Sequence, residues 1–139
     1  FFSNNKNEFY SIDVKTGTIN WINKINSNLT PIITVNLVFT VSNNGYLYVV
    51  EKNSGNIIRV NNLYKIYQEK KKKDIKPVGF AIGSTKLYLT NSDGKMIVAD
   101  LNLGNVIKIE KIAGDIISRP FIYNQNLFVI KNGSVVQYN

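Results

Sequence analysis

The chain has 139 residues, of which 44% are hydrophobic, and it carries 17 Lys and Arg against 9 Asp and Glu. This composition is typical of one folded domain and excludes a disordered chain. The sequence contains neither cysteine nor histidine, which excludes disulfides, thiolate metal sites and a Ser-His-Asp triad. Because the commonest general base is missing, the composition favours a non-catalytic protein.

Short segments rich in Val, Ile, Leu, Phe and Tyr follow one another along the chain. They lie at 35–42, 46–52, 56–61, 86–91, 96–101, 105–112 and 126–131. Clusters of Asn, Gly, Ser or Asp separate them, and no segment keeps a helical spacing for three turns. The sequence therefore predicts an all-β protein of short strands joined by tight turns.

These strands form a repeating unit, and each repeat contains a turn with a glycine. Gly17, Gly55 and Gly104 follow one another at spacings of 38 and 49 residues. Each glycine stands eight residues after the start of an apolar pair: Phe9-Tyr10, Leu47-Tyr48 and Met96-Ile97. A β-sandwich also has evenly spaced strands, but it does not usually repeat aligned landmarks. Four short antiparallel strands in each unit of about 40 residues indicate the blades of a β-propeller.

The repeat divides the chain into blades of unequal completeness. We expect a partial blade at 1–27, a blade at 28–63, a lysine-rich inter-blade loop at 64–77, a blade at 78–113 and a partial last blade at 114–139. Closed propellers have about four to eight blades, and we expect this β-propeller fragment to belong to a parent with eight. An open arc exposes blade faces and strand edges, which leads us to expect that the isolated fragment self-associates.

The inter-blade loop holds much of the net charge of +8. Its basic residues are Lys70, Lys71, Lys72, Lys73 and Lys76. They are candidates for contact with an anionic surface, such as lipid headgroups or an acidic partner. The alternative is a solvated loop without a specific ligand. No interleaving of aromatic and basic residues supports nucleic acid as a partner.

The segment SIDVKTGTINW, residues 11–21, supplies a family resemblance. Its residues Ser11, Asp13, Thr16, Gly17 and Trp21 resemble the tryptophan-docking motif of the PQQ-like (quinoprotein-type) β-propeller repeat. Later copies are degenerate: they keep Gly55, Asp100 and Gly104, while Arg59 and Lys108 stand at the tryptophan position. A glycine can take positive φ in the turn, Asp and Thr can bond the turn backbone, and Trp can pack on the next blade. We therefore interpret these residues as structural and expect no catalytic, cofactor-binding or metal-binding residue among them.

The resemblance extends to two functional branches of the family. The degenerate repeats and the closing segment 119–139 are most similar to BamB, the outer-membrane β-barrel assembly lipoprotein. This branch implies a periplasmic, outer-membrane-associated scaffold of a Gram-negative bacterium, with an upstream lipid anchor, no cofactor and the barrel-inserting subunit as its protein partner. The other branch contains PQQ-dependent dehydrogenases, which hold a quinone and calcium. A PQQ-like propeller of other binding function is a further alternative.

Overall fold

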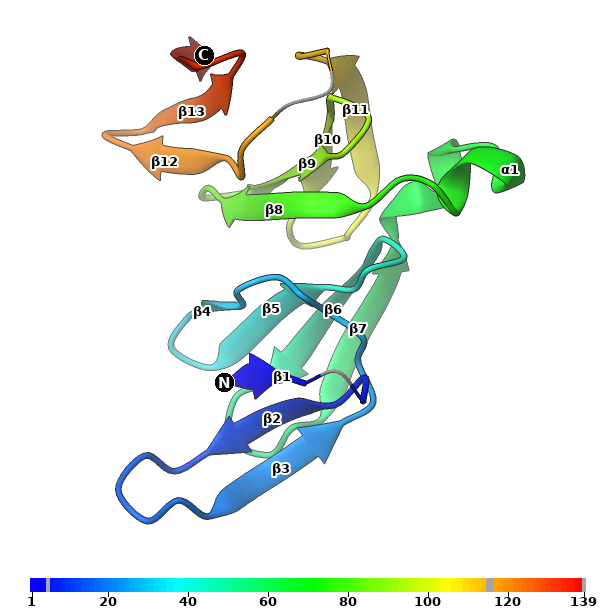
Figure 1. Ribbon diagram of the computed structural model, residues 1–139. Helices are drawn as coiled ribbons and strands as arrows, with labels where there is room; N and C mark the ends of the chain where they lie inside the picture. The colour runs from blue at the N-terminus through cyan, green and yellow to red at the C-terminus, as the bar shows by residue number, and fades with distance from the viewer. Residues whose placement is uncertain (5, 115–116, 139) are drawn as a thin grey trace.

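The chain folds into four antiparallel sheets that follow one another along the sequence (Figure 1). The computed structural model describes residues 1–4, 6–114 and 117–138. Within these residues the first sheet has the order β1-β2-β3, the second β4-β5-β6-β7, the third β11-β10-β9-β8 and the fourth β12-β13-β14. Two sheets are complete four-stranded blades and the two terminal sheets have three strands each, which confirms the predicted β-propeller fragment.

The strands are short and are joined mostly by tight turns. Their bounds are β1 (Phe2–Ser3), β2 (Phe9–Ile12), β3 (Ile19–Asn23), β4 (Ile32–Ile33), β5 (Leu37–Val41), β6 (Tyr46–Glu51), β7 (Ile57–Asn62), β8 (Pro77–Ile82), β9 (Lys86–Asn91), β10 (Lys95–Asp100), β11 (Val106–Lys111), β12 (Phe121–Tyr123), β13 (Asn126–Lys131) and β14 (Ser134–Tyr138). In the first three sheets the last strand pairs with the preceding one through a register shift, as between Ser11 and Ile12 or between Val49 and Val50. Such a bulge increases the local twist, which suits strands arranged in a propeller.

Among the described residues, three hydrophobic cores lie between successive sheets. Adjacent residues of a strand point to opposite faces, so Val38 packs toward the first sheet while Phe39 packs toward the third. In the same way Ile97 packs toward the second sheet, and Met96 toward the fourth. The two central sheets therefore bury both faces, whereas each terminal sheet has a neighbouring sheet on one face.

The segment between the second and third sheets is more ordered than the loop that we expect at 64–77. It contains a 3₁₀ helix, η1 (Leu63–Ile66), and one helical turn, α1 (Glu69–Lys72), and β8 already begins at Pro77. Tyr64 is buried, and its hydroxyl donates to Asn91 Oδ1 at 2.6 Å. Aromatic anchoring of the segment thus accounts for its order. Neither helix of the described residues is long and apolar enough to cross a membrane.

Burial also affects the ionisation of this anchor. Tyr64 and Tyr67 both belong to the core between the second and third sheets, and their rings meet edge to face at 5.3 Å. Removal from water disfavours the phenolate and raises the pKa of both hydroxyls. For Tyr67 the nearby carboxylate of Asp93 acts in the same direction.

Candidate functional site

The first glycine turn, at residues 13–18, is held by a compact set of hydrogen bonds. Asp13 Oδ1 accepts from the backbone N–H groups of Lys15 at 2.8 Å and Thr16 at 2.9 Å. These bonds favour the charged carboxylate and lower the pKa of Asp13. The N–H of Gly17 donates to Asp13 O at 2.8 Å, and Gly17 has a φ of +73°. Asp13 and Gly17 therefore both stabilise the backbone conformation of the turn.

The same backbone pattern recurs at the two other predicted glycines. Gly55 N–H donates to Glu51 O at 2.9 Å, and Gly104 N–H donates to Asp100 O at 2.8 Å. Asp100 Oδ1 accepts from two following N–H groups as Asp13 does, at 2.9 and 2.7 Å. Glu51 instead accepts from the hydroxyl of Ser54. The three turns therefore share their backbone geometry although their side chains differ.

Trp21 connects the first sheet to the second turn. The side chain is 8% exposed, and Nε1 donates to Lys52 O, the carbonyl directly after Glu51, at 2.9 Å. Its ring covers Gly55, where an added Cβ would lie 2.6 Å from Cγ of the indole. Asn23, two residues further along β3, donates from Nδ2 to Gly55 O at 2.8 Å. The indole, the glycine and two backbone carbonyls thus form one contact between adjacent blades.

The other motif residues of the first sheet have smaller parts in this arrangement. Ser11 is buried opposite Trp21 in the β2–β3 pairing, and its hydroxyl lies 3.2 Å from Asn20 Nδ2. Thr16 and Thr18 hydroxyls are 2.8 Å apart on the exposed side of the turn. All five motif residues therefore lie within the hairpin of β2 and β3.

Arg59 makes the corresponding contact between the second and third sheets, which sequence reasoning missed. Its Nη2 donates to Leu101 O at 2.6 Å, and Nη1 donates to Asn102 O. Leu101 directly follows Asp100, as Lys52 follows Glu51. Asn61 lies over Gly104 and donates to Leu103 O at 3.2 Å. The only sequence signal for this role is that Arg59 stands at the tryptophan position and has several donors.

Lys108, the third residue at the tryptophan position, has a different environment. It lies on the exposed strand β11 and pairs with Glu110 at 2.8 Å. No turn faces it within residues 1–4, 6–114 and 117–138. Two blade contacts of the described chain are therefore docked, through Trp21 and Arg59.

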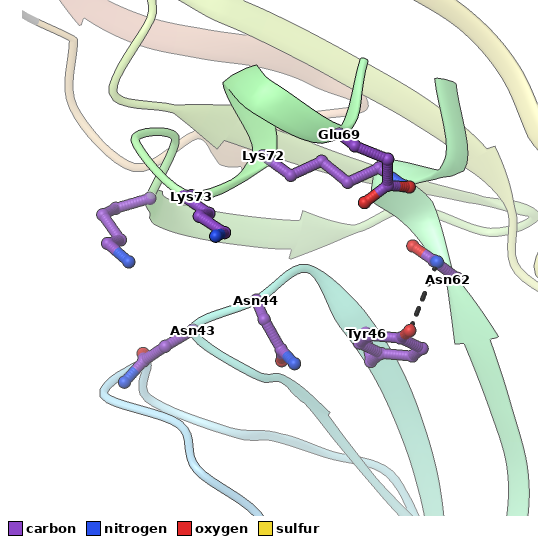
Figure 2. Close-up of a pocket in the computed structure, with 8 residues that line it drawn as sticks. Asn43, Asn44, Tyr46, Asn62, Glu69, Lys72 and Lys73 are labelled. Atoms are coloured by element: carbon purple, nitrogen blue, oxygen red, sulfur yellow. Dashed lines mark hydrogen bonds and ion pairs between the residues drawn. The ribbon is translucent and has the colours of Figure 1, made fainter. Parts of the chain in front are cut away.

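Four of the five predicted basic residues line two different hollows. Lys72, Lys73 and Lys76 line a hollow of about 540 Å3. The rest of its wall consists of Asn43, Asn44, Tyr46, Asn62 and Glu69. Figure 2 shows Lys72 and Lys73 on the helix side and Asn43 and Asn44 on the β5–β6 turn opposite. Lys71 lines a different hollow, beside Asp93 and Lys111, and Lys70 is exposed.

The first hollow contains hydrogen-bond donors that converge from both walls. Lys72 is neutralised by its ion pair with Glu69, at 2.5 Å. Within the described part of the chain, Lys73 and Lys76 make no ion pair, so their ammonium groups are available to an anion. Asn44 Oδ1 accepts from the hydroxyl of Ser42, so this bond does not use the NH2 group of the Asn44 side chain. Lys73 and Lys76 thus present two ammonium groups without an ion-pair partner in the described chain to this hollow.

Acidic side chains of the described chain lie mostly in turns and exposed ion pairs. Asp13, Glu51 and Asp100 serve the glycine turns, and Glu8 pairs with Lys24 at 2.6 Å. Among the residues that the structure describes, no three His, Cys, Asp or Glu side chains are grouped closely enough to hold a metal ion.

These sheets and docking turns define the chain as an arc of a β-propeller. The family model described as outer membrane protein assembly factor BamB matches residues 1–61, the part that contains the first glycine turn and the contact of Trp21 with Gly55. This match confirms the resemblance to PQQ-like, BamB-like propellers that the sequence suggests. No curated protein matches the chain.

Solved propellers share the fold at low sequence identity. BamB from Moraxella catarrhalis superposes with a TM-score of 0.69 at 17% identity, over 94% of this chain and 37% of that chain. The β-propeller domain of Cps50 (Swd1) from Myceliophteria thermophila gives 0.66 at 13% identity, over 89% and 42% of the respective chains. Quinohemoprotein alcohol dehydrogenase from Comamonas testosteroni gives 0.57 at 14% identity, over 76% and 17%. The chain thus spans about a third of the BamB structure that it matches.

Proposed function

We propose that this chain is part of a non-catalytic interaction scaffold that assists the assembly of β-barrel proteins into a bacterial outer membrane. The observation that carries the proposal is the match of residues 1–61 to the BamB family model. In this proposal the protein is periplasmic and associated with the outer membrane through a lipid anchor upstream of residue 1. Its partner is the barrel-inserting subunit of the assembly machinery.

The use of the motif residues supports a scaffold. Trp21 and Arg59 donate to backbone carbonyls of the next blade, and Asp100 holds the turn that offers the carbonyls to Arg59. These groups are engaged in keeping blades together. Surfaces outside these contacts, including the basic hollow, are then available for binding another protein.

Capture of the barrel-inserting subunit tests the proposal. The chain of residues 1–139 is immobilised, and the purified periplasmic part of the subunit is applied at two salt concentrations. We expect saturable capture. An unrelated propeller immobilised at equal density is the control, and equal retention on both surfaces would contradict the proposal.

The basic hollow is the part of this surface that we propose for contact with anionic groups. Lys73 and Lys76 project into it without an ion pair in the described chain. We expect the chain to pellet with vesicles containing anionic lipid at low salt and to be released at high salt. The Lys73→Glu/Lys76→Glu variant should lose this pelleting, whereas Lys70→Glu, on an exposed position outside the hollow, should keep most of it.

A quinone-binding propeller is the second candidate, and the likeness to quinohemoprotein alcohol dehydrogenases is the observation that favours it. The repeat acids speak against it, because the Asp13 and Asp100 carboxylates bind turn N–H groups. Titration of the chain with pyrroloquinoline quinone and Ca²⁺, followed by quinone absorbance, separates the two candidates. Stoichiometric binding would favour the quinone-binding protein, and an unchanged spectrum would favour the scaffold.

A further inference from the structure

The sequence contains two Asn-Gly pairs, Asn44-Gly45 and Asn132-Gly133, and each lies in a turn between two strands. An asparagine before a glycine is prone to lose its side-chain amide, because the glycine has no Cβ to hinder the approach of its backbone nitrogen to the asparagine Cγ. The reaction needs a glycine nitrogen that is free to attack and an asparagine side chain that is free to turn toward it. The two pairs of this chain differ in both respects.

The Asn44-Gly45 pair is restrained by its own turn and by the segment that follows β7. Gly45 N–H donates to Ser42 O at 2.9 Å, and Asn44 Oδ1 accepts from the hydroxyl of Ser42 at 2.6 Å. Tyr64 covers Gly45 so closely that an added Cβ would lie 2.2 Å from Cγ of its ring. The nitrogen that would attack and the side chain that it would attack are therefore both held in place.

The Asn132-Gly133 pair lacks these restraints. It forms the two-residue turn between β13 and β14, in which Lys131 and Ser134 are the last paired residues of the two strands. Within the described part of the chain, the Asn132 side chain and the Gly133 N–H make no hydrogen bond. Both residues are exposed, and nothing lies within 4 Å of a Cβ added at Gly133. The nitrogen and the side chain of this pair are therefore free to react.

The lengths of the two turns account for this difference. Asn132 and Gly133 have φ of +50° and +75°, and a type I′ turn requires positive φ at both central residues. In such a turn the hydrogen bond joins the two flanking residues, so the N–H of the second central residue has no acceptor within the turn. The β5–β6 turn is longer, residues 42–45, and bonds its glycine N–H internally. The free nitrogen of Gly133 is thus a property of the turn itself and does not depend on what covers the fourth sheet.

We propose that Asn132 is a site of spontaneous deamidation in the folded chain, whereas Asn44 is protected. The Gly133 nitrogen loses its proton and bonds to Cγ of Asn132, and the side-chain amide leaves as ammonia. The resulting succinimide ring takes up one water molecule, which opens it at either carbonyl. One product is aspartate, and the other is isoaspartate, whose main chain runs through Cβ. Both products replace a neutral amide by a carboxylate, so each modification lowers the net charge of the chain by one.

The two products differ in their effect on the fourth sheet. Aspartate keeps the length of the turn and tolerates the left-handed backbone that Asn132 has, so the pairing of β13 with β14 is preserved. Isoaspartate adds a main-chain atom to a turn of two residues, which is incompatible with the pairing of Lys131 with Ser134. Val129 of β13 is buried against the third sheet. We therefore expect isoaspartate to loosen β14 while β13 stays packed.

Peptide mass spectrometry of the 139-residue chain, incubated in mildly alkaline buffer, tests the proposal. Samples taken over time are digested at mildly acidic pH, where the reaction is slow, and the amide, aspartate and isoaspartate forms of the peptides containing Asn44 and Asn132 are quantified. Because the Asn44 turn must open before it reacts, we expect Asn132 to deamidate roughly tenfold faster or more. The rate at Asn132 should rise with pH, since the attacking nitrogen has to lose its proton.

The same chain unfolded in urea is the matched control. Unfolding removes the restraints on Asn44, so both asparagines should then deamidate at similar rates. Asn132→Gln keeps an amide but requires a larger ring for the attack, and it should leave residue 132 unmodified without changing the rate at Asn44. Equal rates at Asn44 and Asn132 in the folded chain would overturn the proposal. A rate difference that persists in urea would overturn it as well, because the fold would then not be its cause.

Discussion

The contact between the first and second sheets differs from the contact between the second and third in its chemistry. Trp21 covers Gly55 with an indole and donates once to a carbonyl, whereas Arg59 donates to two carbonyls with its guanidinium. In the second contact the glycine is covered by Asn61 instead. Both contacts reach the carbonyl that directly follows the acid of the turn.

This difference shows which part of the docking motif is maintained. The backbone of the turn, with its positive-φ glycine, is the same in all three copies. Since a carbonyl oxygen accepts from an indole N–H or a guanidinium alike, the donor can change while the docked geometry stays. The predictions below change one contact at a time, from the largest effect to the smallest.

Removal of the indole should have the largest effect. Trp21→Ala leaves a cavity beside Phe1 and Phe9, whose rings lie 5.6 and 5.9 Å from the indole. We expect a loss of about 3–5 kcal/mol in the free energy of unfolding, measured by urea titration. Trp21→Phe keeps an aromatic ring and should lose less. An unchanged stability of Trp21→Ala would refute the docking role.

Removal of the guanidinium should have an intermediate effect. Arg59→Met keeps an unbranched side chain but leaves Leu101 O and Asn102 O without these donors, at a cost of about 1–3 kcal/mol. Lys108→Met is the matched control at the same repeat position, where the side chain is exposed and paired with Glu110. Its stability should change by less than about 0.5 kcal/mol. Equal effects of the two substitutions would show that Arg59 has no docking role.

A fall in pH should have the smallest effect on the stability of the fold, and it should act through the first sheet. Hydrogen bonds from Lys24, Tyr10 and Asn4 lower the pKa of Glu8 to about 2. Because its folded pKa is depressed, Glu8 stabilises the folded chain above about pH 4.5 and loses this contribution as pH falls toward 2. Glu8→Gln should therefore melt below the wild type at pH 6, and the gap should close by pH 2. A gap independent of pH would contradict this assignment.

The blade architecture could be predicted from the sequence because its signals are local. Gly55 and Gly104 mark their turns, and the apolar pair Leu47-Tyr48 already indicates two alternating faces. The role of Arg59 could not be predicted, because its acceptors are backbone carbonyls that any residue supplies. The order of the segment that carries η1 and α1 could not be predicted either, because its lysines suggest a solvated loop. Tyr64 and Tyr67 anchor this segment through contacts with residues far apart in the sequence.

The most direct test of the docking turn is a double-mutant cycle between Trp21 and Gly55. Gly17→Ala gives the cost of positive φ alone, because nothing lies within 4 Å of the added Cβ, and we expect about 1–2 kcal/mol. Gly55→Ala has the same φ cost and in addition meets the indole. It should therefore cost clearly more in the wild type, and its cost should fall toward that of Gly17→Ala in the Trp21→Ala background. If Gly55→Ala costs the same in both backgrounds, the indole does not dock on this turn.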